Sequence, residues 1–144
     1  MQIQRIQTLY ILLAIITMVV FLFVPYGTVV SVADQSVTPI SLSDWTEWGI
    51  LLPVLATIVA LVCSLFYFKK LSGQRQIVTT ALLLTLATIG VVCFTLFKQA
   101  EAQEMTAHFT VWDILLPLAV VFELLAVKGI NHDKALLAST NRLR

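Results

Sequence analysis

The chain has 144 residues, of which 59% are hydrophobic and 12% are charged, and its formal net charge is +1 at pH 7. Soluble proteins carry about 25% charged residues, and a fold in water has no means of burying so much apolar surface. The composition therefore excludes an ordinary soluble domain and predicts a membrane protein, in which the division of basic residues between the two sides matters more than their total.

Four long apolar runs follow one another along the chain, at about residues 6–24, 49–68, 77–97 and 111–127. A membrane-spanning helix needs about 20 mostly apolar residues, which is close to the length of each run. The competing interpretation of the first run is a signal peptide, but that would have an apolar core of only about 7–15 residues. We therefore expect an all-α, four-helix transmembrane bundle that runs up-down-up-down over residues 1–127, followed by a basic tail over 128–144.

The connections between these runs differ sharply in charge. Residues 27–48 contain no Lys or Arg, and their valine-rich half is able to form a short hairpin, whereas residues 98–110 contain only Lys98. The other eight basic residues all fall on the opposite side of the predicted membrane, at Arg5, Lys69, Lys70, Arg75, Lys128, Lys134, Arg142 and Arg144. The positive-inside rule therefore places both termini in the cytoplasm.

Tryptophans mark the predicted outer boundary. Trp45, Trp48 and Trp112 all lie there, as expected of an aromatic belt at headgroup level. The segments Trp48–Pro53 and Trp112–Pro117 are similar in sequence, which suggests two related hairpins. Local preference is the alternative explanation, because Trp at an interface and Pro in a first helical turn are each favoured on their own.

Glu123 stands out because it is an ionisable residue inside a predicted span, and such residues are costly and usually functional. It lies five residues before Lys128, which is roughly 7 Å at helical rise. Counting the same depth into the other spans predicts a polar cluster of Glu123 with Tyr10, Ser64 and Thr80. Two interpretations remain open for this cluster: it fixes helix register, or it is a proton or cation site.

Helical periodicity gives a second view of the same region. Glu123 belongs to a stripe of small residues suited to helix contact, and spans two and three carry matching stripes. These stripes are Trp112, Leu116, Ala119, Glu123 and Ala126; Ala81, Thr85, Thr88, Val92 and Thr95; and Ala56, Ala60 and Ser64.

The remaining chemically active side chains do not form a recognisable site. Cys63 and Cys93 differ in predicted depth by about 18 Å, too far for a disulfide. Glu101, Glu104 and His108 share one face if the third span continues as a helix, but they lack a fourth metal ligand. We find no nucleophile with a base, no phosphate-binding loop and no nucleic-acid-binding face, so we expect neither an enzyme nor a cofactor.

The basic tail suits the membrane surface. Lys128, Lys134, Arg142 and Arg144 are expected to attract anionic lipid. Residues 133–144 are able to form a short helix that places Leu136, Leu137 and Leu143 roughly on one face, which suggests a segment lying on the membrane.

The two ends of the chain resemble a known family. The opening Ile3-Gln4-Arg5-Ile6-Gln7-Thr8-Leu9-Tyr10 and the ending Ile130, Asp133, Leu136, Ser139 and Arg142-Leu143-Arg144 resemble a bacterial family of small four-helix membrane proteins classed as a domain of unknown function. The resemblance implies a four-span protein of the bacterial inner membrane and supplies no activity. Both motifs lie on the predicted cytoplasmic side, so one hypothesis is that Gln4, Arg5 and Gln7 dock with the end residues Arg142 and Arg144 or with a partner protein.

Together these features favour a structural or accessory subunit of a membrane assembly, in contact with lipid and a protein partner. The alternative is a small proton- or cation-coupled transporter or channel that uses Glu123. Because four spans enclose little interior volume, that alternative calls for a homodimer.

Overall fold

The computed structural model describes residues 2–31, 36–41, 48–67, 70–102 and 105–141. Its helices are α1 (Gln2–Phe21), α2 (Trp48–Phe66), α3 (Leu71–Ala102) and α4 (Leu115–Asn141), with a short 3-10 helix, η2 (Val111–Ile114), before α4. Its strands are β1 (Pro25–Ser31), β2 (Val37–Ser41) and β3 (Met105–His108).

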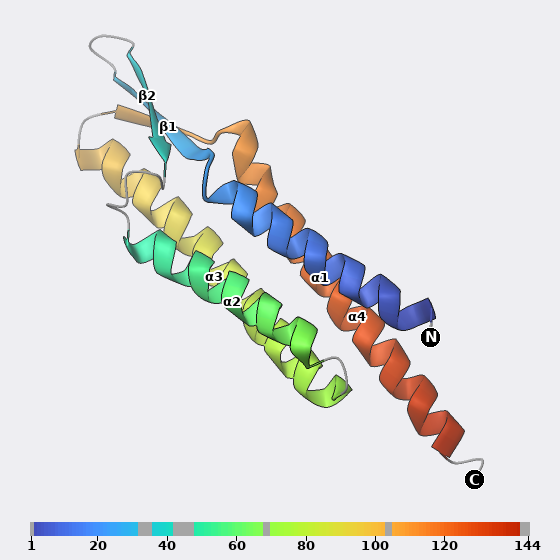
Figure 1. Cartoon of the computed structure of the whole chain (residues 1–144). Coiled ribbons are helices and arrows are strands. Elements are labelled where there is room, and N and C mark those ends of the chain that lie inside the picture. The colour runs from blue at the N-terminus through green and yellow to red at the C-terminus, as the bar shows by residue number, and fades with distance from the viewer. Residues whose placement is uncertain (1, 32–35, 42–47, 68–69, 103–104, 142–144) are drawn as a thin grey trace.

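The four long helices pack side by side. Contacts join α1 to α4, α4 to α3, α3 to α2 and α2 to α1, so that each helix has two helical neighbours. Figure 1 shows both termini and the α2–α3 connection at one end of the molecule and the strands at the other. We call these the terminal end and the sheet end. The prediction of four helices is confirmed.

The prediction of an all-α fold is wrong at the sheet end, where three strands form a sheet in the order β2-β1-β3. The expected valine-rich hairpin is present, with Val29 opposite Thr38 and Val30 opposite Val37. The third strand pairs antiparallel with the other edge of β1. β3 belongs to the connection between α3 and η2, and its pairing covers the second edge of β1, where backbone groups would otherwise be unpaired.

This pairing changes the expected arrangement of acidic residues and His108. Glu101 lies exposed on α3, whereas His108 lies in β3 and Glu104 is outside the described residues. A single helical face carrying all three is therefore wrong.

Two apolar clusters form the core, one toward each end. Tyr26 and Phe21 are the largest members of the sheet-end cluster. Because Tyr26 belongs to β1, the start of this strand packs into the core of the bundle. The sheet-end cluster is Met18, Phe21, Tyr26, Ile50, Val54, Val92, Leu96, Leu116 and Ala119. The terminal-end cluster is Ile11, Ala14, Leu61, Val78, Ala81, Ala126 and Ile130.

The buried faces follow the predicted stripe on α3 and the part of the other stripe that lies on α4, from Leu116 onward, but not the stripe on α2. Trp112, the first member of the α4 stripe, is 47% exposed. Buried positions on α2 include Val54, Thr57, Leu61 and Ser64, whereas Ala56 is exposed. Steps of four residues advance about 40° beyond a full turn, so a run spaced only by four drifts off one face. Alternating steps of three and four stay on it.

The basic tail is not a separate segment, because α4 runs unbroken from Leu115 to Asn141. The boundary expected after residue 127 lies inside this helix, and Ile130 and Asp133 beyond it are buried. The two segments of similar sequence, Trp48–Pro53 and Trp112–Pro117, differ in structure. The first is α-helical from Trp48, whereas the second begins in the 3-10 helix η2.

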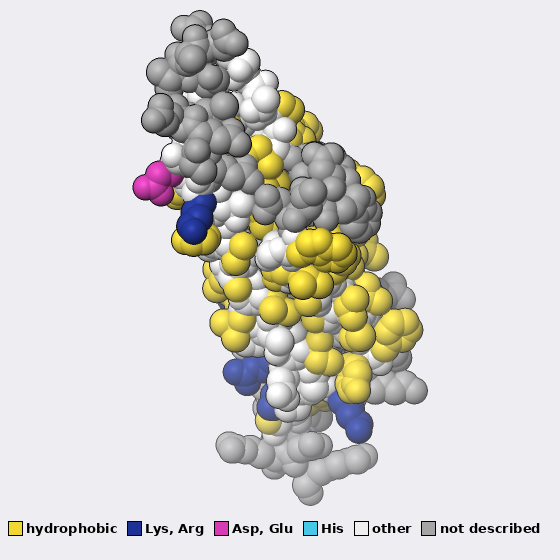
Figure 2. Space-filling model, turned by 90° about the vertical axis from the view of Figure 1, so that its left-hand side faces the viewer, with side chains coloured by type: hydrophobic (Ala, Val, Ile, Leu, Met, Phe, Trp, Pro, Cys, Tyr) yellow, Lys and Arg dark blue, Asp and Glu magenta, His cyan; other side chains and the backbone are white. Residues whose placement is uncertain are grey.

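Much of the surface is apolar. Figure 2 shows one face, where apolar side chains cover the middle and Lys and Arg side chains lie toward the ends. Among the described helices, Trp48–Phe66 and Leu71–Lys98 are long and apolar enough to cross a membrane by length and composition, and Ile6–Phe21 is a shorter apolar helix. Within the two longer segments, only 33% and 28% of an 18-residue apolar stretch is buried, whereas the core helix of a soluble protein is mostly buried.

Candidate functional site

Glu123 lies in the interior of the bundle with none of its surface exposed. The hydroxyl Oγ1 of Thr85 on α3 donates a hydrogen bond to Glu123 Oε1 at 2.9 Å. The other carboxyl oxygen, Oε2, is buried and has no hydrogen-bond partner. Among the side chains that the structure describes, no lysine or arginine forms an ion pair with Glu123.

Four buried threonines on α1, α2 and α3 occupy the same place between the two apolar clusters as Glu123 does on α4. Thr17, Thr57, Thr85 and Thr88 each fall between the sheet-end and terminal-end clusters on their own helix, as Glu123 does on α4. The bundle therefore contains a polar layer, made of these four threonines and Glu123, between its two apolar clusters.

The threonines are satisfied within their own helices. Thr17, Thr57 and Thr88 donate to the carbonyl four residues earlier, each at 2.8 Å. Such bonds let a hydroxyl be buried at low cost, and the hydroxyl oxygen keeps its capacity to accept.

Glu123 is therefore the costly member of the polar layer. A buried ion carries a penalty of several kcal/mol, whereas one hydrogen bond to a charged group returns about 1.5–3 kcal/mol. A single hydroxyl does not offset the burial of a full charge.

The structure does not bring the other residues of the predicted polar cluster to Glu123 by any described hydrogen bond. Tyr10 is half-buried against the terminal-end cluster, and Ser64 donates to the carbonyl of Leu61 at 2.6 Å. Thr80 is exposed and donates to the carbonyl of Gln76 at 3.0 Å. Depth counting selected Thr80, but the periodic stripe on α3 already contained Thr85.

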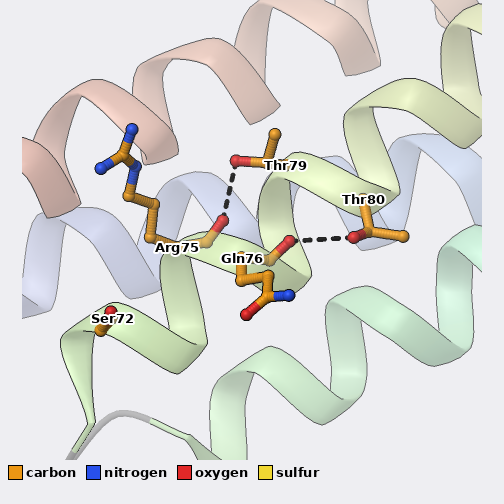
Figure 3. Close-up of a pocket in the computed structure, with 5 residues that line it drawn as sticks. All are labelled: Ser72, Arg75, Gln76, Thr79 and Thr80. Atoms are coloured by element: carbon orange, nitrogen blue, oxygen red, sulfur yellow. Dashed lines mark hydrogen bonds between the residues drawn. The ribbon is translucent and has the colours of Figure 1, made fainter.

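Thr80 instead lines a shallow pocket of about 340 Å³ with Ser72, Arg75, Gln76 and Thr79. Figure 3 shows that all five residues come from the first turns of α3 and that the Thr79 and Thr80 hydroxyls bond to their own helix. One helix supplies the whole lining, so this pocket is an open polar surface with a single cation, Arg75.

A second pocket, of about 150 Å³, lies between α3 and the start of α4. Its lining is apolar apart from Asp113, whose Oδ2 accepts a hydrogen bond from the backbone N–H of Thr110 at 2.6 Å. This capping contact orients the entry into η2 and α4 and gives Asp113 a structural role.

At the terminal end, Gln7 has a partner, Asp133, that the docking hypothesis did not name. Its side chain is buried, and its Nε2 donates to Asp133 Oδ2 on α4. Gly129 makes room for this contact, since a Cβ there would lie 2.9 Å from Gln7 Cγ. The other predicted docking residues, Gln4, Arg5, Arg142 and Arg144, have side chains outside the described part of the chain.

Among the described residues, no group of three or more His, Cys, Asp or Glu side chains is placed to hold a metal ion. Cys63 is exposed on α2 and Cys93 is half-buried on α3, and both are free thiols.

Comparison with known proteins agrees with the resemblance seen at the two ends of the chain. The model of one protein family matches residues 3–143. Neither the curated proteins nor the solved structures gave a match. The chain therefore belongs to the family described as Domain of unknown function (DUF4293).

Proposed function

We propose that the chain is an integral membrane protein that crosses a bacterial inner membrane four times, with both termini in the cytoplasm, and acts as an accessory subunit of a membrane assembly. The observation that carries the membrane placement is the exposure of large apolar side chains on all four helices. Examples are Leu9 (55%), Val59 (60%), Leu83 (62%) and Leu124 (51%).

The position of the charged groups supports the same placement. Within 6–21, 48–66, 76–97 and 114–127, Glu123 is the only Asp, Glu, Lys, Arg or His. The sheet lies beyond these segments, where strand edges can meet water, as they must because lipid offers no hydrogen bonds.

The end of α4 supports the accessory role. Residues 134–140 are all exposed, and Leu136 and Leu137 are 44% and 55% exposed although they lie beyond the apolar segment 114–127. Apolar side chains outside lipid offer contact area to a protein, so we propose that this end of α4 receives the partner.

The test is purification of the tagged chain in mild detergent at its natural expression level, with mass spectrometry of the proteins that accompany it. We expect an unrelated subunit in stoichiometric amount, and its loss from a Leu136→Asp/Leu137→Asp variant. Ala138→Asp is the matched control, because it adds charge about 150° around the helix from the middle of that pair. Recovery of the chain with no stoichiometric companion would contradict the accessory role.

A second candidate is a small proton- or cation-coupled transporter, favoured by the fully buried Glu123 with its unpartnered Oε2. Four helices leave little room for a path, so a second copy of the chain would complete it. Reconstituted vesicles would then show proton movement, followed with an internal pH-sensitive dye, in the wild type and not in Glu123→Gln.

A further inference from the structure

Thr85 stands between two acceptors and has one hydrogen to give. Its Oγ1 lies 2.9 Å from Glu123 Oε1 and 3.1 Å from the backbone carbonyl oxygen of Ala81. A hydroxyl donates once but accepts twice. The two distances therefore correspond to two hydrogen-bonding states with the same heavy-atom positions.

In the first state Glu123 is a carboxylate and Thr85 donates to it. In the second state Glu123 is a carboxylic acid that donates its proton to Thr85 Oγ1, while Thr85 donates to the carbonyl of Ala81. The second state satisfies every hydrogen and leaves no buried charge, whereas the first leaves a charged Oε2 without a partner.

We propose that Glu123 and Thr85 form a proton-binding site in the middle of the bundle, with Glu123 as the proton carrier and Thr85 as the hydroxyl that accepts from the acid and donates to the carboxylate. This inference rests on the second candidate function and names its ligand as a proton. A bound metal ion would need a shell of about six oxygen ligands, whereas Thr85 is the only described side chain that hydrogen-bonds to Glu123.

Few other ionisable groups are positioned to influence this proton. Within the apolar segment 6–21 of α1 the only ionisable side chain is the half-buried Tyr10, and within 76–97 of α3 it is the half-buried Cys93. Cys63 on α2 is exposed, and Asp113 lies in η2 before α4 begins. Lys128 lies in the middle of α4 with its side chain exposed, and Asp133 is hydrogen-bonded to Gln7. The described helices therefore bring no opposite charge to stabilise the ionised form.

Loss of the proton has a structural consequence. A carboxylate at this position needs water or a further donor at Oε2, and the apolar clusters on either side provide neither.

The test is infrared difference spectroscopy of the full chain in lipid vesicles at neutral pH, in light and heavy water. A protonated carboxylic acid has a carbonyl band distinct from the bands of a carboxylate. We expect one such band in the wild type and its loss in Glu123→Gln, whose amide keeps the size of the side chain. Identical spectra for the two proteins would overturn the proposal.

Thr85→Val and Thr88→Val provide a second test that leaves Glu123 in place. Both threonines are fully buried and both donate to the carbonyl four residues earlier, but of the two only Thr85 has a described hydrogen bond to Glu123. We expect the acid band to shift in Thr85→Val and to stay in place in Thr88→Val. Equal band positions in both variants would refute the role of Thr85.

Cation replacement separates a proton from a metal ion. The band should be the same in sodium, potassium or choline chloride, and its disappearance on adding sodium or potassium would identify a metal-ion site instead. A Glu123-dependent band without Glu123-dependent proton movement across the vesicle membrane would keep the proton site and reject the transport candidate.

Discussion

At the scale of single residues, close approaches between helices and strands rest on small side chains. Gly27 in β1 packs directly against Leu96 of α3, and a Cβ at position 27 would collide with the Leu96 side chain. Leu96 is itself 1% exposed and belongs to the sheet-end cluster, so its side chain is packed inside the core. This contact therefore holds β1, and with it the sheet, against α3.

Gly27→Ala should destabilise the protein by about 1–3 kcal/mol, the usual cost of overpacking a filled core. Gly90→Ala is the matched control, since a Cβ there meets nothing within 4 Å and alanine favours the helix. Thermal unfolding in detergent would compare the two. A melting temperature lowered equally in both variants would show that the Leu96 contact is not the cause.

At the scale of elements, the Gln7–Asp133 hydrogen bond joins α1 to α4 across 126 positions of sequence. Both residues belong to the two terminal motifs through which the chain resembles its family. The structure thus gives these motifs a shared role in holding the terminal ends of two helices together. The expected docking of Gln7 with Arg142 and Arg144 involves residues outside the described part of the chain and stays a prediction.

Gln7→Ala should cost about 1–3 kcal/mol, because it leaves Asp133 buried with neither oxygen bonded. The Gln7→Ala/Asp133→Ala double variant should lose less than the sum of the two single losses. Gln76→Ala, an exposed glutamine on α3, serves as the control and should change little. Strict additivity in denaturant unfolding would mean that the two side chains do not stabilise each other.

At the scale of the whole molecule, the sheet and the terminal end are the two extremes of one elongated bundle (Figure 1). The proposed membrane placement sets them on opposite sides of the bilayer. Ser36 beside β2 and Ser139 on α4 are both exposed, one at each extreme, and neither lies in the apolar segments. They are therefore suited to report on orientation.

In a background with Cys63 and Cys93 replaced by alanine, a membrane-impermeant maleimide added to intact cells should label Ser36→Cys and leave Ser139→Cys unlabelled. Both should react after the inner membrane is made permeable. Labelling of Ser139→Cys in intact cells would reverse the orientation, and equal labelling of both would contradict a bilayer between them.

The sequence by itself predicted the number of helices, the valine-rich hairpin, the family and the interior faces of α3 and α4. These follow from local patterns: apolar length, turn residues and the 3.6-residue period that put Thr85 and Glu123 on contact stripes. These predictions do not depend on which element is the neighbour, because each pattern involves residues only a few positions apart in the sequence.

Only the tertiary structure decided which residues meet. Thr85 rather than Thr80 reaches Glu123, β3 pairs with β1, and Gln7 reaches Asp133. Each contact depends on the position of one element along the axis of its neighbour. That position is determined jointly by the packing of whole helix faces and by the connections between elements. Depth counted from basic residues misjudged this offset because α4 continues to Asn141, well past Lys128, the residue from which that depth was measured.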